Sequence, residues 1–467
     1  MADPLGVSIA FDDPPLTADP AWTQIDTLAG CRVRDWSIDR GRPTEFDKTG
    51  TGTAVVHIVD RQGLFDPTNA TSPYNGKIVP GKQAGIALVN PTGAHASFVM
   101  FRGFVESWGY RLHTTEHWME LELQLVDGFS VLARAELRLG IDGVIPVPTG
   151  AEGNIVYGET LGSVNDRINA ILGDVGWPAG LTDVFTGNVR VGPKAYAPGT
   201  SALDALFDAA DGEFPGVANL FMSKDGKVTF RGRQARFRPD VAEYGIQRRT
   251  VADPANWSMG TVGPPATPKT VPVAELEWVL GHDSLFNSAS ATPQGVGTGS
   301  SWRPWNPAPP DNDDADGQLV KDDTSIGNYG LSSITFDNLQ TVEGTATGNN
   351  STVETKGFAY YYVNNYKTPQ PRLSRLVFKS RHPADQYADT LWTHLCQCEI
   401  SDLLTLKTTH PGGGGFNTGF YVEGLHYTCR PGSAPGGAVL TPIVELSLDV
   451  SPAAHYTTNP FPGDIDP

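Results

Sequence analysis

The sequence predicts a β-rich α+β protein of several domains, in which two antiparallel β-barrels flank an inserted α+β domain. Segments with a period of two lie near both ends of the chain, and helical spacing lies between them. The 52 glycines and 37 prolines, with only 39% hydrophobic residues, are typical of many short strands joined by turns. We divide the 467 residues into 1–135 (first barrel), 136–270 (inserted domain), 271–350 (a strand segment and an acidic, Pro/Gly-rich loop) and 351–467 (helices and the strands of the second barrel).

The two barrels are predicted from turn residues and from alternation. Between Trp36 and Gly81, each strand-like run stops at a Gly, Asn or Pro cluster and another run follows. Near the end of the first barrel, four apolar residues alternate with polar ones: Met119, Leu121, Leu123 and Leu125. The same pattern returns close to the end of the chain in Val444, Leu446, Leu448 and Val450. A period of two places the apolar set on one face of a half-buried strand.

The inserted domain is predicted from a change of period. Apolar residues at helical spacing indicate a helix over 161–172 that ends at Gly173, because glycine takes positive φ without strain. Ser201 and Asp204 are typical of an N-cap and its partner three residues later. The turn at Asp225-Gly226 then predicts a hairpin after this second helix.

The pattern is mixed after residue 270. Prolines and an acidic run from Asp311 to Asp316 predict that residues 295–323 form an excursion without a core element. Helices are expected near 353–365 and near 384–395, before the strands of the second barrel.

Charge and composition exclude several classes of protein. The formal charge of −18 argues against sequence-specific binding of nucleic acid, since such proteins present a basic face. The N-terminus carries no basic segment followed by an apolar core, and no apolar run approaches the ~20 residues of a membrane span, so neither a signal peptide nor a membrane segment is expected. The four cysteines are too few for a disulfide scaffold, which fits assembly in a reducing cytoplasm: Cys31, Cys396, Cys398 and Cys429.

One acidic segment approaches the pattern of a calcium loop. Asn312, Asp314 and Asp316 alternate, Gly317 follows them, and Asp323 occupies the twelfth position. The segment departs from the pattern, because Asn stands first, the twelfth residue is Asp in place of Glu, and prolines precede it where a helix is needed. We therefore interpret it as a solvated acidic loop, with calcium binding as the alternative, and expect no metal and no cofactor.

Zinc and catalytic patterns are weaker still. His394, Cys396 and Cys398 do not have the C-x2–4-C spacing of tetrahedral zinc sites, so we expect buried, unreactive cysteines. The chain contains no G-x-S-x-G elbow and no H-E-x-x-H. No pair of carboxylates stands out among 52 acidic residues as a glycosidase pair. We expect no catalytic residue and no enzymatic activity.

Tryptophans leave a second function open. Large aromatic residues in strand-rich chains are more often core or interface anchors than sugar-stacking platforms. The alternative is a β-rich, cell-surface protein that binds or hydrolyses carbohydrate through exposed tryptophans. The candidates are Trp22, Trp36, Trp108, Trp118, Trp177, Trp302, Trp305 and Trp392.

Several motifs occur in an order that points to one family. W-S-I-D-R-G-R begins at Trp36 and T-G-T-A-V-V-H at Thr51, and F-R-G-F-V, L-V-D-G-F and Y-V-E-G-L begin at Phe101, Leu125 and Tyr421. No single motif is specific, but the ordered set spans most of the chain. In this respect the sequence resembles the tail hub proteins, or minor tail proteins, of long-tailed phages (siphophages) that infect high-GC Gram-positive bacteria.

The resemblance implies a structural protein of the virion. It implies a ring at the tail tip, a homotrimer, that joins the tail tube to the tip and leaves an axial channel for DNA ejection. The implied partners are other copies of the chain and neighbouring tail proteins, namely the distal tail protein, the tape measure protein and tip or receptor-binding proteins. From the excess of acidic residues we further expect a channel wall that is acidic or neutral, along which DNA slides without binding.

Overall fold

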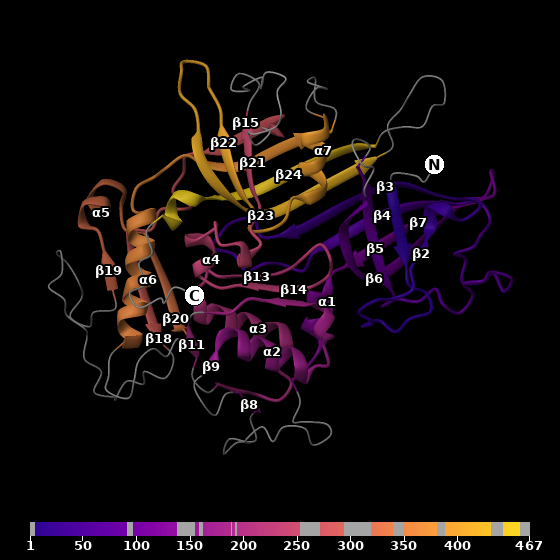
Figure 1. The fold of residues 1–467 in the computed structure, drawn as a ribbon, viewed down its shortest axis with the longest axis horizontal. Coiled ribbons are helices and arrows are strands. Elements are labelled where there is room, and N and C mark those ends of the chain that lie inside the picture. Colours follow the sequence, from indigo (N-terminus) through magenta and orange to yellow (C-terminus); the bar gives the residue numbers. More distant parts are fainter. Residues whose placement is uncertain are drawn as a thin grey trace.

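The computed structural model describes residues 5–90, 97–137, 155–157, 162–187, 189–191, 194–252, 271–293, 319–339, 350–380, 388–430 and 442–457. Figure 1 shows the strands from the two ends of the chain side by side across the top and right of the molecule, with a helical part below and a second helical part at the left. Within the described residues, no helix is long and apolar enough to cross a membrane.

The largest element is a 14-stranded sheet built from both ends of the chain. Its N-terminal strands are β1 (Leu5–Ile9), β2 (Thr23–Gln24), β3 (Cys31–Gly41), β4 (Thr53–Asp60), β5 (Gln83–Val89), β6 (Ser97–His113) and β7 (Trp118–Val126). Its later strands are β15 (Arg248–Ala252), β16 (Val271–Pro272), β17 (Glu275–Val279), β21 (Arg372–Lys379), β22 (Leu403–Lys407), β23 (Asn417–Arg430) and β24 (Ile443–Pro452).

Strand β23 joins the two groups of strands. Its first residues pair with β22, its last residues pair with β3, and β24 pairs along its other edge. The order of strands is therefore β16-β15-β22-β23-β3-β4-β7-β6-β5-β1-β2, with β24, β21 and β17 following in turn from β23. A β-rich α+β fold is confirmed. The pairings of the described residues do not close either group into a barrel, so the two barrels remain a prediction.

Alternation along the strands creates one main core beneath this sheet. In β7, Leu121, Leu123 and Leu125 are at most 1% exposed, whereas Glu122 and Gln124 between them are exposed. The apolar residues of β24 enter the same cluster, and helix α7 (Ala388–Gln397) contributes Leu391, Trp392 and Leu395 to it. Both alternating patterns are thus confirmed as half-buried strands.

The inserted part packs around its own cluster of apolar residues. It contains helices α1 (Gly128–Arg134), α2 (Val164–Asp174), α3 (Ala202–Ala210) and α4 (Gln234–Phe237). Strands β10 (Thr182–Val184), β13 (Asn219–Met222) and β14 (Val228–Arg231) form a three-stranded sheet. Two further pairs are formed by β8 (Ile155–Tyr157) with β12 (Lys194–Tyr196) and by β9 (Gly162–Ser163) with β11 (Arg190–Val191).

Two local predictions in this part are confirmed and one is wrong. The Ser201 hydroxyl accepts a hydrogen bond from the amide of Asp204 at 3.1 Å, as an N-cap does. The hairpin of β13 and β14 turns at Gly226, which has φ +76°. Gly173, however, does not end its helix: α2 continues to Asp174, and Gly176 takes the left-handed conformation with φ +69°. The helix thus runs one residue past Gly173, and the glycine that takes the left-handed conformation after it stands three residues later than predicted.

The remaining part combines a three-stranded sheet with a long helix. Strands β18 (Ser288–Pro293), β19 (Leu319–Lys321) and β20 (Ser333–Leu339) pair with one another, and α5 (Asp323–Tyr329) lies between β19 and β20 in the chain. Helix α6 (Asn350–Tyr366) contacts β18 and contributes Phe358, Tyr362 and Tyr366 to a third, aromatic-rich cluster. The helices expected near 353–365 and 384–395 are confirmed by α6 and α7.

Candidate assembly interface

Eight consecutive strands present a continuous polar face to the outside. They are β17, β21, β24, β23, β3, β4, β7 and the second half of β6. Cross-strand partners lie on the same side of a sheet, so the register brings Asp39 beside His426, and His57 beside both Asp35 and Glu122. We call this side the polar face; the opposite side packs into the main core.

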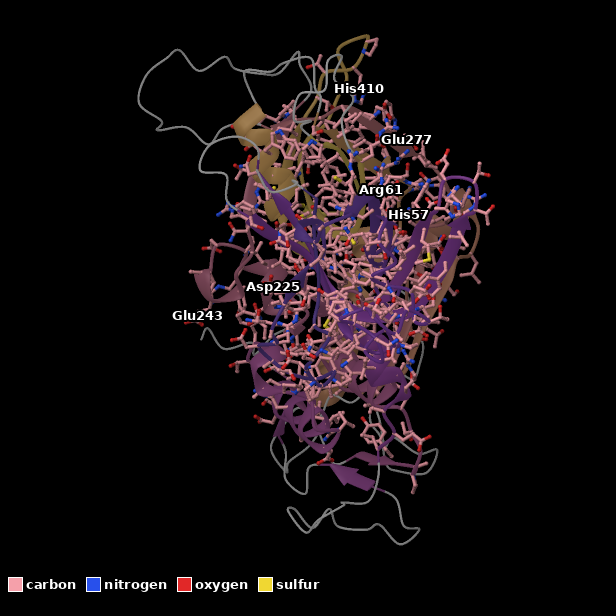
Figure 2. The ribbon with its side chains drawn as sticks, turned by 90° about the vertical axis from the view of Figure 1, so that its right-hand side faces the viewer. His57, Arg61, Asp225, Glu243, Glu277 and His410 are labelled. Carbon is pink, nitrogen blue, oxygen red and sulfur yellow. The ribbon has the colours of Figure 1, made fainter. Side chains whose placement is uncertain are left out.

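The polar face lies on one side of the molecule. Figure 2 shows His57 and Glu277, which belong to its strands, on the right-hand side. Asp225 and Glu243, which belong to the inserted part, lie on the left-hand side. The polar face is therefore not covered by the inserted part in this view.

Several of its charged residues on β3, β4 and β7 are paired with one another. The Nδ1 atom of His57 lies 2.5 Å from Asp35 Oδ1, and its Nε2 atom lies 3.7 Å from Glu122 Oε2. The guanidinium of Arg34 contacts Asp35 at 2.8 Å and also pairs with Glu120. Each exposed pair contributes little to stability, on the order of 0–1 kcal/mol. Their main effect is that they cancel charge locally.

The other end of the polar face carries a similar ladder. Lys379 on β21 pairs with Glu275 on β17 and, at 3.9 Å, with Glu445 on β24. Arg375 lies 3.8 Å from Glu277 and 3.7 Å from the same Glu445. Cations of the middle strand thus neutralise carboxylates on both neighbouring strands.

His426 connects the two halves of the polar face. Its Nδ1 atom lies 2.5 Å from Asp39 Oδ1 on β3, and its Nε2 atom lies 2.7 Å from Asp449 Oδ2 on β24. Hydrogen bonds to Asp39 and Asp449 raise the pKa of His426 to about 9, although burial acts in the opposite direction. His426 is therefore charged, as an imidazolium, at neutral pH. It bridges two carboxylates at the join of the sheet, the place where β23 lies between β3 and β24.

A buried ion cluster lies behind this join. Glu423 is fully buried and accepts from Arg42 at 2.8 Å, from Arg236 at 2.6 Å and from Ser451 at 2.6 Å. Burial alone would raise the pKa of Glu423, but the two arginines and the Ser451 hydroxyl lower it to about 2. The cluster ties together the segment after β3, helix α4 and strand β23. Sequence reasoning missed it, because no local pattern marks residues so far apart as partners.

Glycines of the family-like motifs make close contacts with other motifs. Gly41 has φ +99°, and a Cβ on it would lie 2.2 Å from the carbonyl oxygen of Glu423, so the W-S-I-D-R-G-R and Y-V-E-G-L motifs touch through their glycines. The amide of Gly52 donates to Asp127 Oδ2 at 2.7 Å, which joins T-G-T-A-V-V-H to L-V-D-G-F. The motifs therefore specify how strands meet.

The calcium-like segment lies mostly outside the described residues. Asn312, Asp314, Asp316 and Gly317 all fall there. Asp323 is the first residue of α5, and the preceding Asp322 accepts from the Ser325 amide at 2.8 Å and pairs with Lys367 at 2.9 Å. The interpretation of residues 312–317 as a solvated loop stays a prediction. The excursion without a core element that was expected over 295–323 is wrong at its end, because β19 (Leu319–Lys321) pairs with β18 and Val320 is 3% exposed in the aromatic-rich cluster.

The zinc-like residues lie in the main core. His394, Cys396 and Cys398 are at most 1% exposed, and the ring of His394 packs against Phe378 with centroids 4.4 Å apart. Burial raises the pKa of Cys396 to about 12 and raises that of Cys398 still further. Among the described residues, no group of three or more His, Cys, Asp and Glu side chains is placed to hold a metal ion. The expected burial of the cysteines is confirmed.

Most of the tryptophans proposed as sugar platforms are not exposed. Trp36, Trp177 and Trp392 are at most 6% exposed, and Trp108 and Trp118 are partly buried. Trp22 is 39% exposed, with the Arg102 guanidinium 5.5 Å from its ring centroid. Trp302 and Trp305 lie outside the described residues.

Sequence reasoning also missed an exposed tryptophan, Trp278 of β17. It is 47% exposed, and its ring stacks on His410 with centroids 4.6 Å apart. The apolar run Trp278-Val279-Leu280 breaks the alternation of its strand, and this run was the feature of the sequence that could have indicated an exposed tryptophan.

Comparison with known proteins gives a likeness of fold. No protein-family model and no curated protein matches the chain. A tail protein from Neisseria meningitidis MC58 has a similar structure, with 12% identity, a TM-score of 0.53 and coverage of 97% of this chain and 98% of that one. A prophage tail protein from Listeria monocytogenes EGD-e overlaps at a TM-score of 0.42, with 7% identity over 95% of this chain and 94% of that one. A Francisella PdpA–VgrG complex overlaps at 0.43, with 10% identity over 95% of this chain and 57% of that one.

Of these three, only the likeness to the N. meningitidis tail protein supports an argument about the fold. It extends over nearly all of both chains, and at this identity it establishes a similar fold and nothing more. The chain therefore shares the β-rich architecture of a protein described as a tail protein.

Proposed function

We propose that this chain is a structural protein of a phage-type tail, a hub at the tail tip, and that it is not an enzyme. The observation that supports this best is the single sheet that both ends of the chain build, with its continuous polar face. The shared fold with the N. meningitidis tail protein, over 97% of this chain, agrees with such a role. In the proposal, copies of the chain form a closed ring, a trimer, in the virion.

The polar face is the proposed wall of the axial channel. Its acidic residues are Asp35, Asp39, Glu120, Glu122, Glu275, Glu277, Glu445 and Asp449. Its lysines and arginines are fewer: Arg32, Arg34, Arg111, Arg375, Lys379 and Arg430. Half of these six cations, Arg34, Arg375 and Lys379, are held by neighbouring carboxylates, and the eight acidic residues outnumber the cations, which limits the positive charge that is free to bind phosphates. A wall of this kind lets DNA pass without attachment.

The proposed partners are other copies of the chain and neighbouring tail proteins, and the proposed location is the tail tip of a siphophage. A ring needs contacts to the tail tube on one side and to tip proteins on the other. These partners are expected to be the distal tail protein, the tape measure protein and a receptor-binding protein. Assembly in the host cytoplasm precedes release of the particle.

The test is a reconstruction of the particle that contains this chain. We expect threefold density for the chain at the tail tip, with the polar face toward the axis. A single copy per particle, or absence of the chain from the tail, would contradict the hub function. Polar-face residues pointing outward would contradict only the channel wall.

Carbohydrate binding has less support. That alternative needs exposed tryptophans, and three of its candidates are buried in the cores. A glycan array on the full chain checks it, and binding that depends on Trp22 would favour it.

A further inference from the structure

The geometry points to a binding site for an uncharged amide with an apolar side chain, in a cavity of about 330 Å³ where three parts of the chain meet. The carbonyl oxygen of the ligand accepts from Arg42 at the wall of the cavity, and the apolar side chain packs against phenylalanine rings. This inference does not depend on the proposed hub function. Two sources share this chemistry: a free acylated amino acid amide, and an apolar residue within a peptide segment.

Three parts of the molecule supply the wall of the cavity. The connection between β3 and β4 contributes Arg42 and residues 46–49. Helix α3 and the turn after it contribute residues 207–211 in part, and strand β20 contributes Thr335, Phe336 and Leu339. Ligand sites are commonly pockets of roughly 300–1,000 Å³ at the junctions of separately packed parts. A ligand in this cavity therefore contacts all three parts at once.

Arg42 leaves one donor at this cavity without a partner. Its side chain is 5% exposed, its Nε atom donates to Glu423 at 2.8 Å, and its Nη1 atom donates to the carbonyl oxygen of Asp47 at 3.1 Å. The Nη2 atom is buried and has no hydrogen-bond partner among the described residues. A buried donor without a partner is destabilising, and a ligand that brings an acceptor removes this penalty.

The charges of the wall favour an acceptor that carries no charge. Two cations, Arg42 and Lys48, line the cavity together with three carboxylates, those of Asp47, Asp208 and Asp211. Each carboxylate already has a hydrogen-bond or ion-pair partner, and that of Asp211 is Lys48 at 3.3 Å. A carboxylate ligand would be repelled by this set, and an ammonium ligand would leave Nη2 unpaired. An uncharged carbonyl group meets both conditions.

The apolar part of the wall is aromatic and includes a strained residue. The cavity is lined by the rings of Phe46, Phe207, Phe214 and Phe336. Phe214 is fully buried and has φ +74°, which is uncommon for a bulky residue, and its ring stacks on Phe358 with centroids 4.5 Å apart. Strain of this kind persists where the surrounding packing fixes it, and it clusters at ligand clamps. The apolar side chain of the ligand lies against these rings.

Ligand-observed NMR with the full chain tests the site. The probe is N-acetyl-leucinamide. Of its analogues, N-acetylglycinamide lacks the apolar side chain, N-acetyl-leucine carries a carboxylate and leucinamide carries an ammonium group. We expect the probe to bind with a dissociation constant on the order of 1 mM, and each analogue to bind about tenfold more weakly. Equal or tighter binding of any analogue, or no binding of the probe, would overturn the inference.

Two variants on one strand locate the binding. Thr335 and Ser333 are both exposed on β20, and of the two it is Thr335 that lines the cavity. Thr335→Trp should fill the cavity and weaken binding of the probe by about tenfold, whereas Ser333→Trp should leave the affinity unchanged. Equal affinities of the two variants would place the probe elsewhere on the molecule and contradict the assignment.

A structure of the complex gives a second readout. We expect a carbonyl oxygen of the probe within about 3.2 Å of Arg42 Nη2. An ordered water on Nη2, with no probe in the cavity, would show that solvent satisfies this donor and that the site is not a ligand site. The peptide acetyl-Gly-Leu-Gly-amide distinguishes the sources: tighter binding than that of the probe assigns the site to a peptide segment, and weaker binding assigns it to a free small molecule. Failure of these tests leaves the hub function standing.

Discussion

Replacement of Glu423 by glutamine is the most informative perturbation of the fold. Glu423 is fully buried and receives hydrogen bonds from Arg42, Arg236 and Ser451. Glutamine keeps the shape of the side chain and removes its charge, so two arginines lose their shared counter-ion. The perturbation acts where three segments of the chain meet.

The magnitude follows from the shifted pKa. A change of the Glu423 pKa from 4.5 to about 2 corresponds to ~3 kcal/mol of folding free energy at neutral pH. Removal of one member of a buried ion pair generally costs roughly 3–5 kcal/mol. We therefore expect Glu423→Gln to lower the free energy of unfolding at pH 7 by about 3–5 kcal/mol.

The same reasoning fixes the pH dependence. Because the folded-state pKa of Glu423 is depressed, its stabilising effect is complete above pH 4.5 and is lost as the pH falls toward 2. The wild-type protein should lose stability over this window. Glu423→Gln should show a flatter profile there, because it has no carboxylate to protonate at this position.

Urea unfolding followed by tryptophan fluorescence, at pH 7 and in steps from pH 5 to pH 2, measures both effects. Glu243→Gln is the matched control, since Glu243 is exposed on the opposite side of the molecule. Equal losses for Glu423→Gln and Glu243→Gln at pH 7, or identical acid profiles for Glu423→Gln and wild type, would refute the reasoning.

Three further predictions concern the join and the core. His426→Ala should lower the free energy of unfolding by about 1 kcal/mol, a value that allows for a side chain that is 42% exposed. Because the pKa of His426 is raised to about 9, its contribution to stability in the wild type is complete below pH 6.5 and is lost as the pH rises through 9. Urea unfolding of both proteins at pH 6 and pH 10 measures this, and an equal loss of stability at the two pH values would contradict the bridge. Gly41→Ala should destabilise the fold by roughly 2–4 kcal/mol, because the new Cβ would lie 2.2 Å from a carbonyl oxygen. Gly81 also has a positive φ, +86°, but a Cβ there would have no atom within 4 Å, so Gly81→Ala should cost only about 1 kcal/mol. Similar melting temperatures for the two variants would show that the close approach at Gly41 is unimportant. Cys396 and Cys398 should resist a thiol reagent at pH 8 until urea unfolds the chain, because burial raises the pKa of both thiols, and rapid labelling of the native protein would disprove this.

Local structure followed from the sequence wherever neighbours in the chain decide it. The alternation of Leu121, Leu123 and Leu125, the cap at Ser201 and the turn at Gly226 depend on residues a few positions apart, and the structure has all three. The helix end at Gly173 was wrong, since helix α2 has the residues to continue by one more position and a later glycine completes the turn.

Long-range pairing could not be predicted in the same way. Nothing in the spacing of Arg42 and Glu423 indicates that they form an ion pair, or that β3 and β23 are adjacent. The interpretation of both chain ends as strand-rich was correct, but a period of two does not identify the partner strand.

The pairing of β3 with β23 has a consequence for biosynthesis. Arg42 and Glu423 are 381 positions apart, and translation at about 5–20 residues per second separates their synthesis by roughly 20 to 80 s. During this interval β3 is complete but lacks one neighbour, so its edge is open to wrong partners. Folding dominated by such distant contacts is slow. Premature termination anywhere before β23 would leave this edge permanently open, and truncated chains should aggregate where full-length chains stay soluble.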